Sequence, residues 1–233
     1  MKNCNVVGFA GVCLLLSGCS AAARRETDQF SADFEDSPPG RVPTGWRITA
    51  TNPTAPMAEW AVRAADGAGV SKLFALTRSQ NYDGTYNLAI AEQAHFADLE
   101  LSVRVRADAG KEDQGGGPIW RVQDENNYYI SRFNPLEGNF RVYVVSGGKR
   151  RQLETVKLEL AAGRWYELRI RMVGDEITCW LDGTPHLHAR DSTITKPGCI
   201  GLWTKADAVT SFDDLQVRAL RTPAVDDGAP PPR

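Results

Sequence analysis

Apolar and polar residues alternate along much of this chain. In residues 99–107 (LELSVRVRA) every odd position is apolar, and in residues 165–173 (WYELRIRMV) Tyr, Leu, Ile and Met hold the even positions. A period of two is typical of an antiparallel strand with one buried and one solvated face. No stretch of a dozen residues keeps apolar positions at helical spacing with caps at its ends. The sequence therefore predicts an all-β protein.

Short turn sequences separate the apolar runs. They are SGGK at 146–149, VGDE at 173–176 and LDGT at 181–184. Glycine in such places supplies the positive φ that a tight hairpin needs. Counting the runs gives roughly ten to fourteen strands with short connections. This pattern predicts an antiparallel β-sandwich or jelly roll.

The N-terminus resembles the export signal of a bacterial lipoprotein. Lys2 precedes an apolar run over 6–16, and LLSGC follows at 15–19. About 11 apolar residues are too few for a membrane-spanning helix, which needs roughly 20. The resemblance implies cleavage before Cys19, lipidation of Cys19 and, with Ser20 after it, attachment to the outer membrane of a bacterial cell envelope. A plain signal peptide with a chance cysteine is the alternative.

These segments define the expected organisation. We expect a signal peptide over 1–18, a small and polar tether over 19–29, one folded domain over 30–219, and a disordered tail rich in Pro, Ala and Asp over 220–233. The folded part has about 190 residues, which suits one domain with a substantial core.

Charge and cysteine content narrow the partners and the chemistry. The chain has 27 basic and 29 acidic residues, so there is no general electrostatic case for binding nucleic acid. After cleavage at Cys19, only Cys179 and Cys199 remain as unmodified cysteines. In an oxidising compartment they form either a disulfide or two buried thiols.

Four segments resemble the concanavalin A-like lectin and glucanase superfamily. They are DFEDSPPGRVPTGW near the start, GGGPIWRVQDENNYYISRFN, AGRWYELRIRMVGDEITCWLDG, and PGCIGLWTKADAVTSFDDLQV near the end. Within the superfamily the chain is most similar to laminin-G-like and 3-keto-disaccharide hydrolase-like domains of exported bacterial proteins. The resemblance covers about 30–219 and implies a jelly roll whose concave sheet is the ligand face.

Alternation predicts which side chains lie on that face. If Phe140, Val142 and Val144 point between the sheets, Arg141 and Tyr143 point to the other surface. The same alternation on the neighbouring strands adds the other residues that point to this surface. The predicted ligand-contacting residues are Arg121, Arg132, Asn134, Arg141, Tyr143, Trp203 and Lys205. Aromatic rings stack on sugars while Arg and Asn bond to hydroxyl groups, so we predict an oligo- or polysaccharide partner. Alternatively these arginines only solubilise the sheet, and a register slip of one residue would reverse every assignment.

Catalysis stays open at this stage. A retaining glycosidase needs two carboxylates about 5 Å apart. The family 16 glucanases of the superfamily that this chain resembles carry them in a Glu-x-Asp-x-x-Glu strand, which is absent here. Similarity to the 3-keto-disaccharide hydrolases implies cleavage of an oxidised sugar by one general base, with or without a metal ion. Asp124, Glu137 and Asp207 lie near the predicted face, and none ranks above the others. We carry three interpretations: a carbohydrate-binding lipoprotein, a glycan hydrolase or lyase, and a non-catalytic protein-interaction module.

Acidic residues near the two ends of the domain are candidates for a metal site. DFED places Glu35 after the first predicted strand, and FDD places Asp213 on the last. First and last strands commonly pair in such sandwiches, and carboxylates with loop carbonyls suit calcium. The alternative is that these acids cap strand edges or bind backbone amides.

Overall fold

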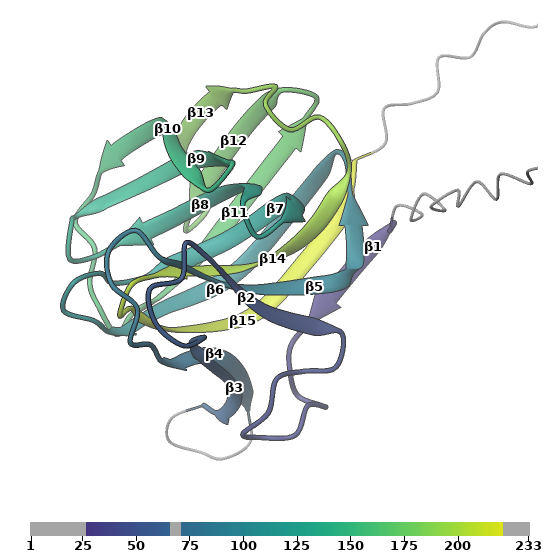
Figure 1. Ribbon diagram of the computed structural model, residues 1–233. Helices are drawn as coiled ribbons and strands as arrows, with labels where there is room; N and C mark the ends of the chain where they lie inside the picture. Colours follow the sequence, from purple (N-terminus) through teal and green to yellow (C-terminus); the bar gives the residue numbers. More distant parts are fainter. Residues whose placement is uncertain (1–26, 66–70, 221–233) are drawn as a thin grey trace, which may run out of the picture.

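The chain forms two antiparallel sheets packed face to face. The computed structural model describes residues 27–65 and 71–220, which contain fifteen strands and no helix (Figure 1). Sheet A contains, in spatial order, β13 (Thr184–Arg190), β12 (Glu176–Leu181), β11 (Trp165–Val173), β6 (Leu99–Ala109), β15 (Val209–Ala219), β4 (Lys72–Arg78) and β3 (Glu59–Ala64), and β1 (Gln29–Ala32) also pairs with β15. Sheet B contains β10 (Lys149–Lys157), β9 (Asn139–Ser146), β8 (Asn127–Asn134), β7 (Gly116–Asp124), β14 (Gly198–Lys205), β5 (Tyr86–Phe96) and β2 (Trp46–Thr51).

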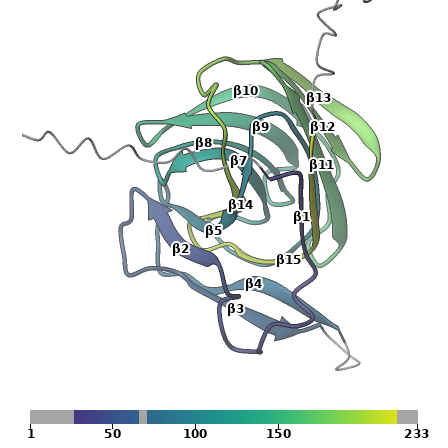
Figure 2. The same cartoon turned by 90° about the vertical axis from the view of Figure 1, so that its right-hand side faces the viewer.

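The main core lies between the two sheets, which Figure 2 shows side by side. On β6 the odd-numbered residues from Leu99 to Ala107 are all fully buried, and β11 buries its even-numbered residues in the same way. The alternation in the sequence therefore predicts correctly which residues are buried on both strands. The sequence prediction of an antiparallel β-sandwich is confirmed.

All three predicted turns join consecutive strands. Gly147 and Gly148 have φ of 55° and 74° between β9 and β10, and Gly174 has φ of 59° between β11 and β12. In the β12–β13 turn Asp182 and Gly183 also have positive φ. The strand count exceeds the expected ten to fourteen by one.

The first and last strands pair, as predicted, with Ala32 opposite Leu215. The predicted lipidation site Cys19, the signal segment over 1–18 and nearly all of the tail lie outside the described residues. Among the described residues, none belongs to a helix long and apolar enough to cross a membrane.

Cys179 and Cys199 are both buried thiols that form no disulfide with each other, so the disulfide alternative is wrong and the two-thiol alternative holds. Cys179 on β12 belongs to the core between the sheets, whereas Cys199 on β14 belongs to a second cluster on the outer side of sheet B. Burial raises the pKa of the Cys179 thiol to about 12, so it is inert at neutral pH.

Candidate functional site

The outer face of sheet B carries an aromatic cluster of its own. Eleven buried residues form it, and none of them belongs to the core between the sheets. They are Tyr86, Leu88, Ile90, Ile119, Val122, Tyr128, Ile130, Tyr143, Val145, Cys199 and Trp203. A solvated sheet back would carry mainly polar side chains at these positions, so this face is not an ordinary one.

Strand pairing places six of the seven predicted ligand-contacting residues on this face. Arg132 on β8 lies opposite Arg141 on β9, and Tyr143 lies opposite Ile130. On β14, Trp203 lies opposite Leu88. Asn134 is the last residue of β8 and Lys205 is the last residue of β14, and both lie on the same face as Arg132 and Trp203. The predicted register is therefore correct for β8, β9 and β14.

Arg121 is the exception, because a β-bulge in β7 changes the register there. Its φ is 47°, and the pairing with β8 shifts between Trp120 and Asp124. The Arg121 guanidinium donates to the carbonyls of Ala97 at 2.8 Å and Ile194 at 2.9 Å. It also forms an ion pair with Asp98 at 2.9 Å, where the chain passes from β5 to β6. Arg121 thus fixes two loops at the edge of the sandwich and is not part of the outer face.

A carboxylate between two arginines forms the polar end of the face. Arg132 is 1% exposed; its Nη1 donates to Asn139 Oδ1 at 2.7 Å and its Nη2 to Glu137 Oε2 at 3.1 Å. Arg141 Nη1 donates to the same Glu137 oxygen at 3.0 Å. Both guanidiniums also lie near the hydroxyl of Tyr143, at 3.3 and 3.4 Å. The loop between β8 and β9 therefore contributes Glu137 to the face.

Glu137 is ionised at every physiological pH. Burial acts to raise its pKa, but the hydrogen bond from Asn139 and the charges of Arg132 and Arg141 outweigh it and lower the pKa to about 2. A carboxylate with so low a pKa is a poor general base, since little driving force remains for taking a proton. Glu137 is suited to accepting hydrogen bonds from a ligand.

A guanidinium covers the aromatic part of the face. Arg150 on β10 lies 4.4 Å from the ring centre of Tyr143, 5.0 Å from that of Tyr86 and 5.8 Å from that of Trp203. Its Nη1 is buried and has no hydrogen-bond partner. The rings are thus covered by cation–π contacts alone, and Arg150 is free to exchange them for a ligand.

An ion cluster adjoins Glu137, because Asn134 accepts from the Glu137 backbone N–H at 3.1 Å and also contacts this cluster. Lys205 Nζ lies 2.5 Å from Asp83 and 2.9 Å from Asp113, and Asn134 donates to Asp113 at 2.8 Å. Burial raises the pKa of Asp113 despite the opposing charges of Lys205 and Arg132. Asp113 is thus the carboxyl on this face whose pKa moves toward neutrality, as a general base requires.

The other two candidate bases hold loops together. Asp124 accepts the backbone N–H of Asn126 at 2.7 Å and the side-chain amide of Asn127, so it caps the β7–β8 turn. Asp207 accepts three successive backbone N–H groups from residues 111–113. These bonds outweigh burial and lower the pKa of Asp207. Neither carboxylate faces a ligand.

The predicted calcium residues lie near the β1–β15 pair. Glu35 Oε1 already accepts from the Ser71 hydroxyl and the backbone of Lys72, and the Lys72 amine bonds to the Glu35 carbonyl. Within 27–65 and 71–220, no three His, Cys, Asp or Glu side chains gather closely enough to hold a metal ion. A calcium ion at Glu35 and Asp213 stays a prediction.

Three residues of the face escaped the sequence reasoning: Tyr86, Asp113 and Arg150. Arg150 follows the SGGK turn and lies opposite Val145, so extending the alternation across that hairpin would have found it. Tyr86 lies opposite Lys205 and had no recognisable partner in sequence. Asp113 comes from a loop, where no period operates.

The fold is an antiparallel β-sandwich with the concanavalin A-like jelly-roll architecture. Residues 33–218 match the family of 3-keto-alpha-glucoside-1,2-lyase-like domains. The chain belongs to this family, which confirms the resemblance seen in the sequence.

Solved structures of low sequence identity share the fold. Carbohydrate-binding module CBM66 from Bacillus subtilis aligns with a TM-score of 0.58 and 22% identity over 75% of this chain and 96% of its own. The cellulose-induced protein Cip1 aligns with a TM-score of 0.61 and 15% identity over 83% and 98% of the two chains. A Bacillus licheniformis β-glucanase aligns with a TM-score of 0.56 and 10% identity over 84% of this chain and 100% of its own. No curated protein matches the sequence.

Proposed function

We propose that this protein binds a saccharide on the outer face of sheet B, the face that the sequence analysis expects to be concave. The observation that carries the proposal is the conjunction of an aromatic platform and charged hydrogen-bonding groups on one face. Trp203, Tyr143 and Tyr86 form the platform, and Arg141 and Glu137 lie beside it. Sugars present an apolar ring face and a rim of hydroxyl groups, which these two parts match.

The exposure of the side chains indicates how a sugar would approach. The side chains of Arg141 and Glu137 are 29% and 37% exposed, whereas Arg132 behind them is almost completely buried. Arg141 and Glu137 are therefore available to a ligand directly, and Arg132 holds Glu137 in place. Contact with the rings requires displacement of Arg150, whose cation–π contacts a sugar would replace.

Isothermal titration with neutral oligosaccharides and their 3-keto derivatives tests the proposal. We expect saturable binding that Arg141→Ala weakens about tenfold, since it removes charge-assisted hydrogen bonds. Arg171→Ala, an exposed arginine on β11 of sheet A, is the matched control and should bind like the parent. Equal binding by both variants would refute this site. If no saccharide binds, the protein-interaction alternative takes its place.

A specific observation favours elimination chemistry as a second candidate function. The chain belongs to a lyase-like family, and Asp113 has a raised pKa beside Lys205 beneath the same face. Asp113 is 1% exposed, so a substrate meets it only when Lys205 or Asn134 moves aside. In a 3-keto glycoside the proton next to the carbonyl is acidic, so one carboxylate can remove it. The electron pair then forms a carbon–carbon double bond, and the glycosidic oxygen leaves and takes up a proton.

Product release from a 3-keto disaccharide tests that second candidate. We expect Asp113→Asn to abolish turnover while saccharide binding persists. Asp175→Asn, an exposed acid in the β11–β12 turn, is the control. Turnover that survives Asp113→Asn would assign the base elsewhere, and absence of turnover in the parent protein would leave the binding function alone.

The proposed location is the bacterial cell envelope, with the protein held by lipid on Cys19. Support comes from the lipobox-like LLSGC segment. Expression of Cys19→Ala should release the protein from the membrane fraction and abolish incorporation of labelled fatty acid. Membrane retention of that variant would contradict the anchor.

A further inference from the structure

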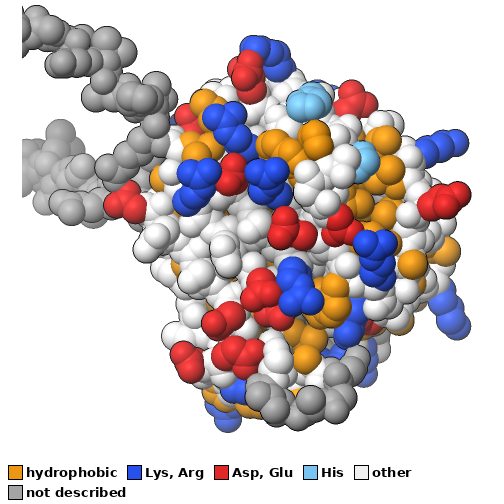
Figure 3. Space-filling model, turned by 180° about the vertical axis from the view of Figure 1, so that it is seen from behind, with side chains coloured by type: hydrophobic (Ala, Val, Ile, Leu, Met, Phe, Trp, Pro, Cys, Tyr) orange, Lys and Arg blue, Asp and Glu red, His pale blue; other side chains and the backbone are white. Residues whose placement is uncertain are grey.

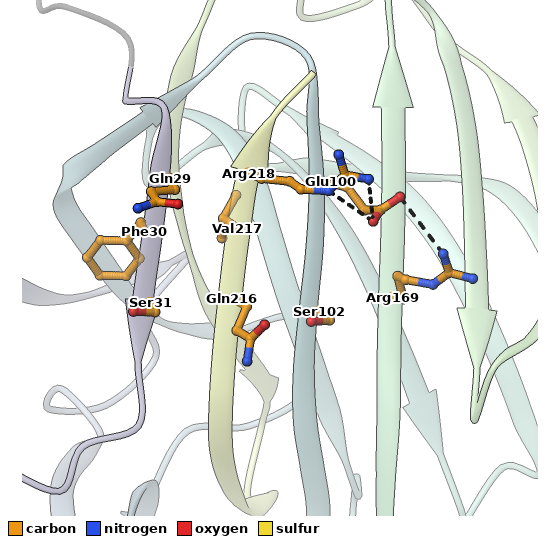
Figure 4. Close-up of a pocket in the computed structure, with 9 residues that line it drawn as sticks. All are labelled: Gln29, Phe30, Ser31, Glu100, Ser102, Arg169, Gln216, Val217 and Arg218. Carbon is orange, nitrogen blue, oxygen red and sulfur yellow. Dashed lines mark hydrogen bonds and ion pairs between the residues drawn. The ribbon is translucent and has the colours of Figure 1, made fainter. Parts of the chain in front are cut away.

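A second groove crosses the outer face of sheet A, on the side of the molecule opposite the proposed saccharide site. Its volume is about 580 Å³, within the usual range for small-ligand sites. Figure 4 shows that its lining comes from four adjacent strands, β1, β15, β6 and β11. The lining residues are Gln29, Phe30, Ser31, Glu100, Ser102, Arg169, Gln216, Val217 and Arg218.

Strand register arranges the floor of the groove as a row. Ser31 lies opposite Gln216, Gln216 opposite Ser102, and Ser102 opposite Arg169. Neighbouring strands are about 4.8 Å apart, so the row is roughly 14 Å long. Ser102 is short, and it leaves a hollow between the longer side chains of Gln216 and Arg169. This length suits a short chain of sugars better than a single one.

The neutral polar side chains of the groove bond to no other group in the described part of the chain. Gln29, Ser31, Ser102 and Gln216 make no side-chain hydrogen bond within the described residues. Together they offer two carboxamides and two hydroxyls, which are both donors and acceptors. A ligand with many hydroxyl groups needs this mixture.

The charged residues of the groove are already paired. Glu100 accepts from Arg218 at 3.0 Å and lies 3.8 Å from Arg169. The Arg169 guanidinium also lies 4.1 Å from the ring centre of Trp180. Figure 3 shows that basic and acidic side chains are interspersed over this side of the molecule. The groove holds two arginines against one glutamate, and Glu100 contacts both of them, so the groups left for a ligand are the neutral amides and hydroxyls.

We infer that this groove is a second binding site, for a neutral oligosaccharide. The amide and hydroxyl groups of the floor bond to sugar hydroxyls. The site is separate from the face of sheet B and does not depend on the function proposed there. Two such sites on opposite sides would let one domain hold two segments of glycan.

Titration of the full chain with cellotetraose and maltotetraose tests the inference, with trigalacturonate as the charged comparison. We expect two equivalents of a neutral probe to bind, and shifts of the backbone amide signals of Ser31, Ser102 and Gln216 in nuclear magnetic resonance spectra. Gln29→Ala/Gln216→Ala should weaken one of the two sites about tenfold, and Ser102→Tyr should fill the groove and remove that site. Gln80→Ala, an exposed glutamine outside both sites, is the matched control.

The outcomes separate this inference from the proposed function. One equivalent that only the groove variants abolish supports the groove and refutes the site on sheet B. One equivalent that Arg141→Ala weakens and the groove variants leave intact overturns the groove inference alone. Binding of trigalacturonate in the groove in place of the neutral probes also overturns it, and absence of all binding overturns both.

Discussion

Trp203 and Arg132 show how deeply the residues of the sheet B face are embedded. Each is 1% exposed, and Trp203 Nε1 lies 3.3 Å from the hydroxyl of Tyr128. Side chains of this kind stabilise the fold whether or not a sugar binds. Their replacement therefore cannot report on binding alone, and the rim residues are the better probes.

Trp203→Ala should lower the free energy of unfolding by about 3–5 kcal/mol, because it leaves a cavity in a packed aromatic cluster. Arg141→Ala should cost less than about 1 kcal/mol, since its ion pair is partly solvated. Urea denaturation followed by fluorescence measures both. A small effect of Trp203→Ala on the free energy of unfolding would show that the aromatic cluster is less tightly packed than the burial of Trp203 indicates.

Asp213 links stability to pH. Burial and the negative charge of Asp214 raise the pKa of the Asp213 carboxyl from 3.8 to about 6. The hydrogen bond from the Asp214 backbone N–H and the charge of Arg104 act in the opposite direction but are weaker. A raised carboxyl pKa means that the folded state favours the protonated form. The contribution of protonated Asp213 to the free energy of unfolding is therefore fully present below about pH 4, and it is lost as the pH rises through about 6.

Asp213→Asn should therefore raise the free energy of unfolding at pH 7 by about 1–2 kcal/mol, because it removes an unfavourable buried charge. It should also flatten the dependence of the melting temperature on pH between 4 and 6. Thermal melts at half-unit intervals check this. A variant as pH-dependent as the parent would exclude Asp213 as the cause.

At the scale of elements, alternation predicts the strands well and fails where a strand is irregular. β8 and β9 contain no register shift in their pairing, and every assignment on them is correct. β7 contains a bulge at Arg121, after which Val122 moves to the outer cluster. One inserted residue reverses all later assignments, and nothing in a single sequence marks its position. Loop residues such as Asp113 have no period and were missed for that reason.

The bulge at Arg121 supports a stability prediction. Arg121→Ala leaves the carbonyls of Ala97 and Ile194 without their donor and removes the ion-pair partner of Asp98, which keeps the Gly174 N–H, at an expected cost of about 2–4 kcal/mol. Saccharide affinity, measured at a temperature where the variant is folded, should not change. A loss of affinity with intact stability would return Arg121 to the ligand face.

At the scale of the whole molecule, the pairing of β1 with β15 brings the two ends of the domain together. It places Glu35 close enough for its charge to raise the pKa of Asp213. Two carboxylates that repel each other at neutral pH would be relieved by a divalent cation, which is the physical content of the calcium hypothesis. If no ion binds, the repulsion between Glu35 and Asp213 persists. The folded protein should therefore be more stable with a bound ion than without one.

Chelation distinguishes them. If calcium binds, excess EDTA should lower the melting temperature of the parent protein by several degrees at pH 7, and added calcium should restore it, because an ion that binds only the folded state stabilises that state. Asp213→Asn should be insensitive to both, since it lacks the central ligand. Asp36→Asn, an exposed acid of the same DFED segment, is the control and should respond like the parent. A parent melting temperature unchanged by EDTA would instead mean that Lys72 and Arg104 alone balance these carboxylates.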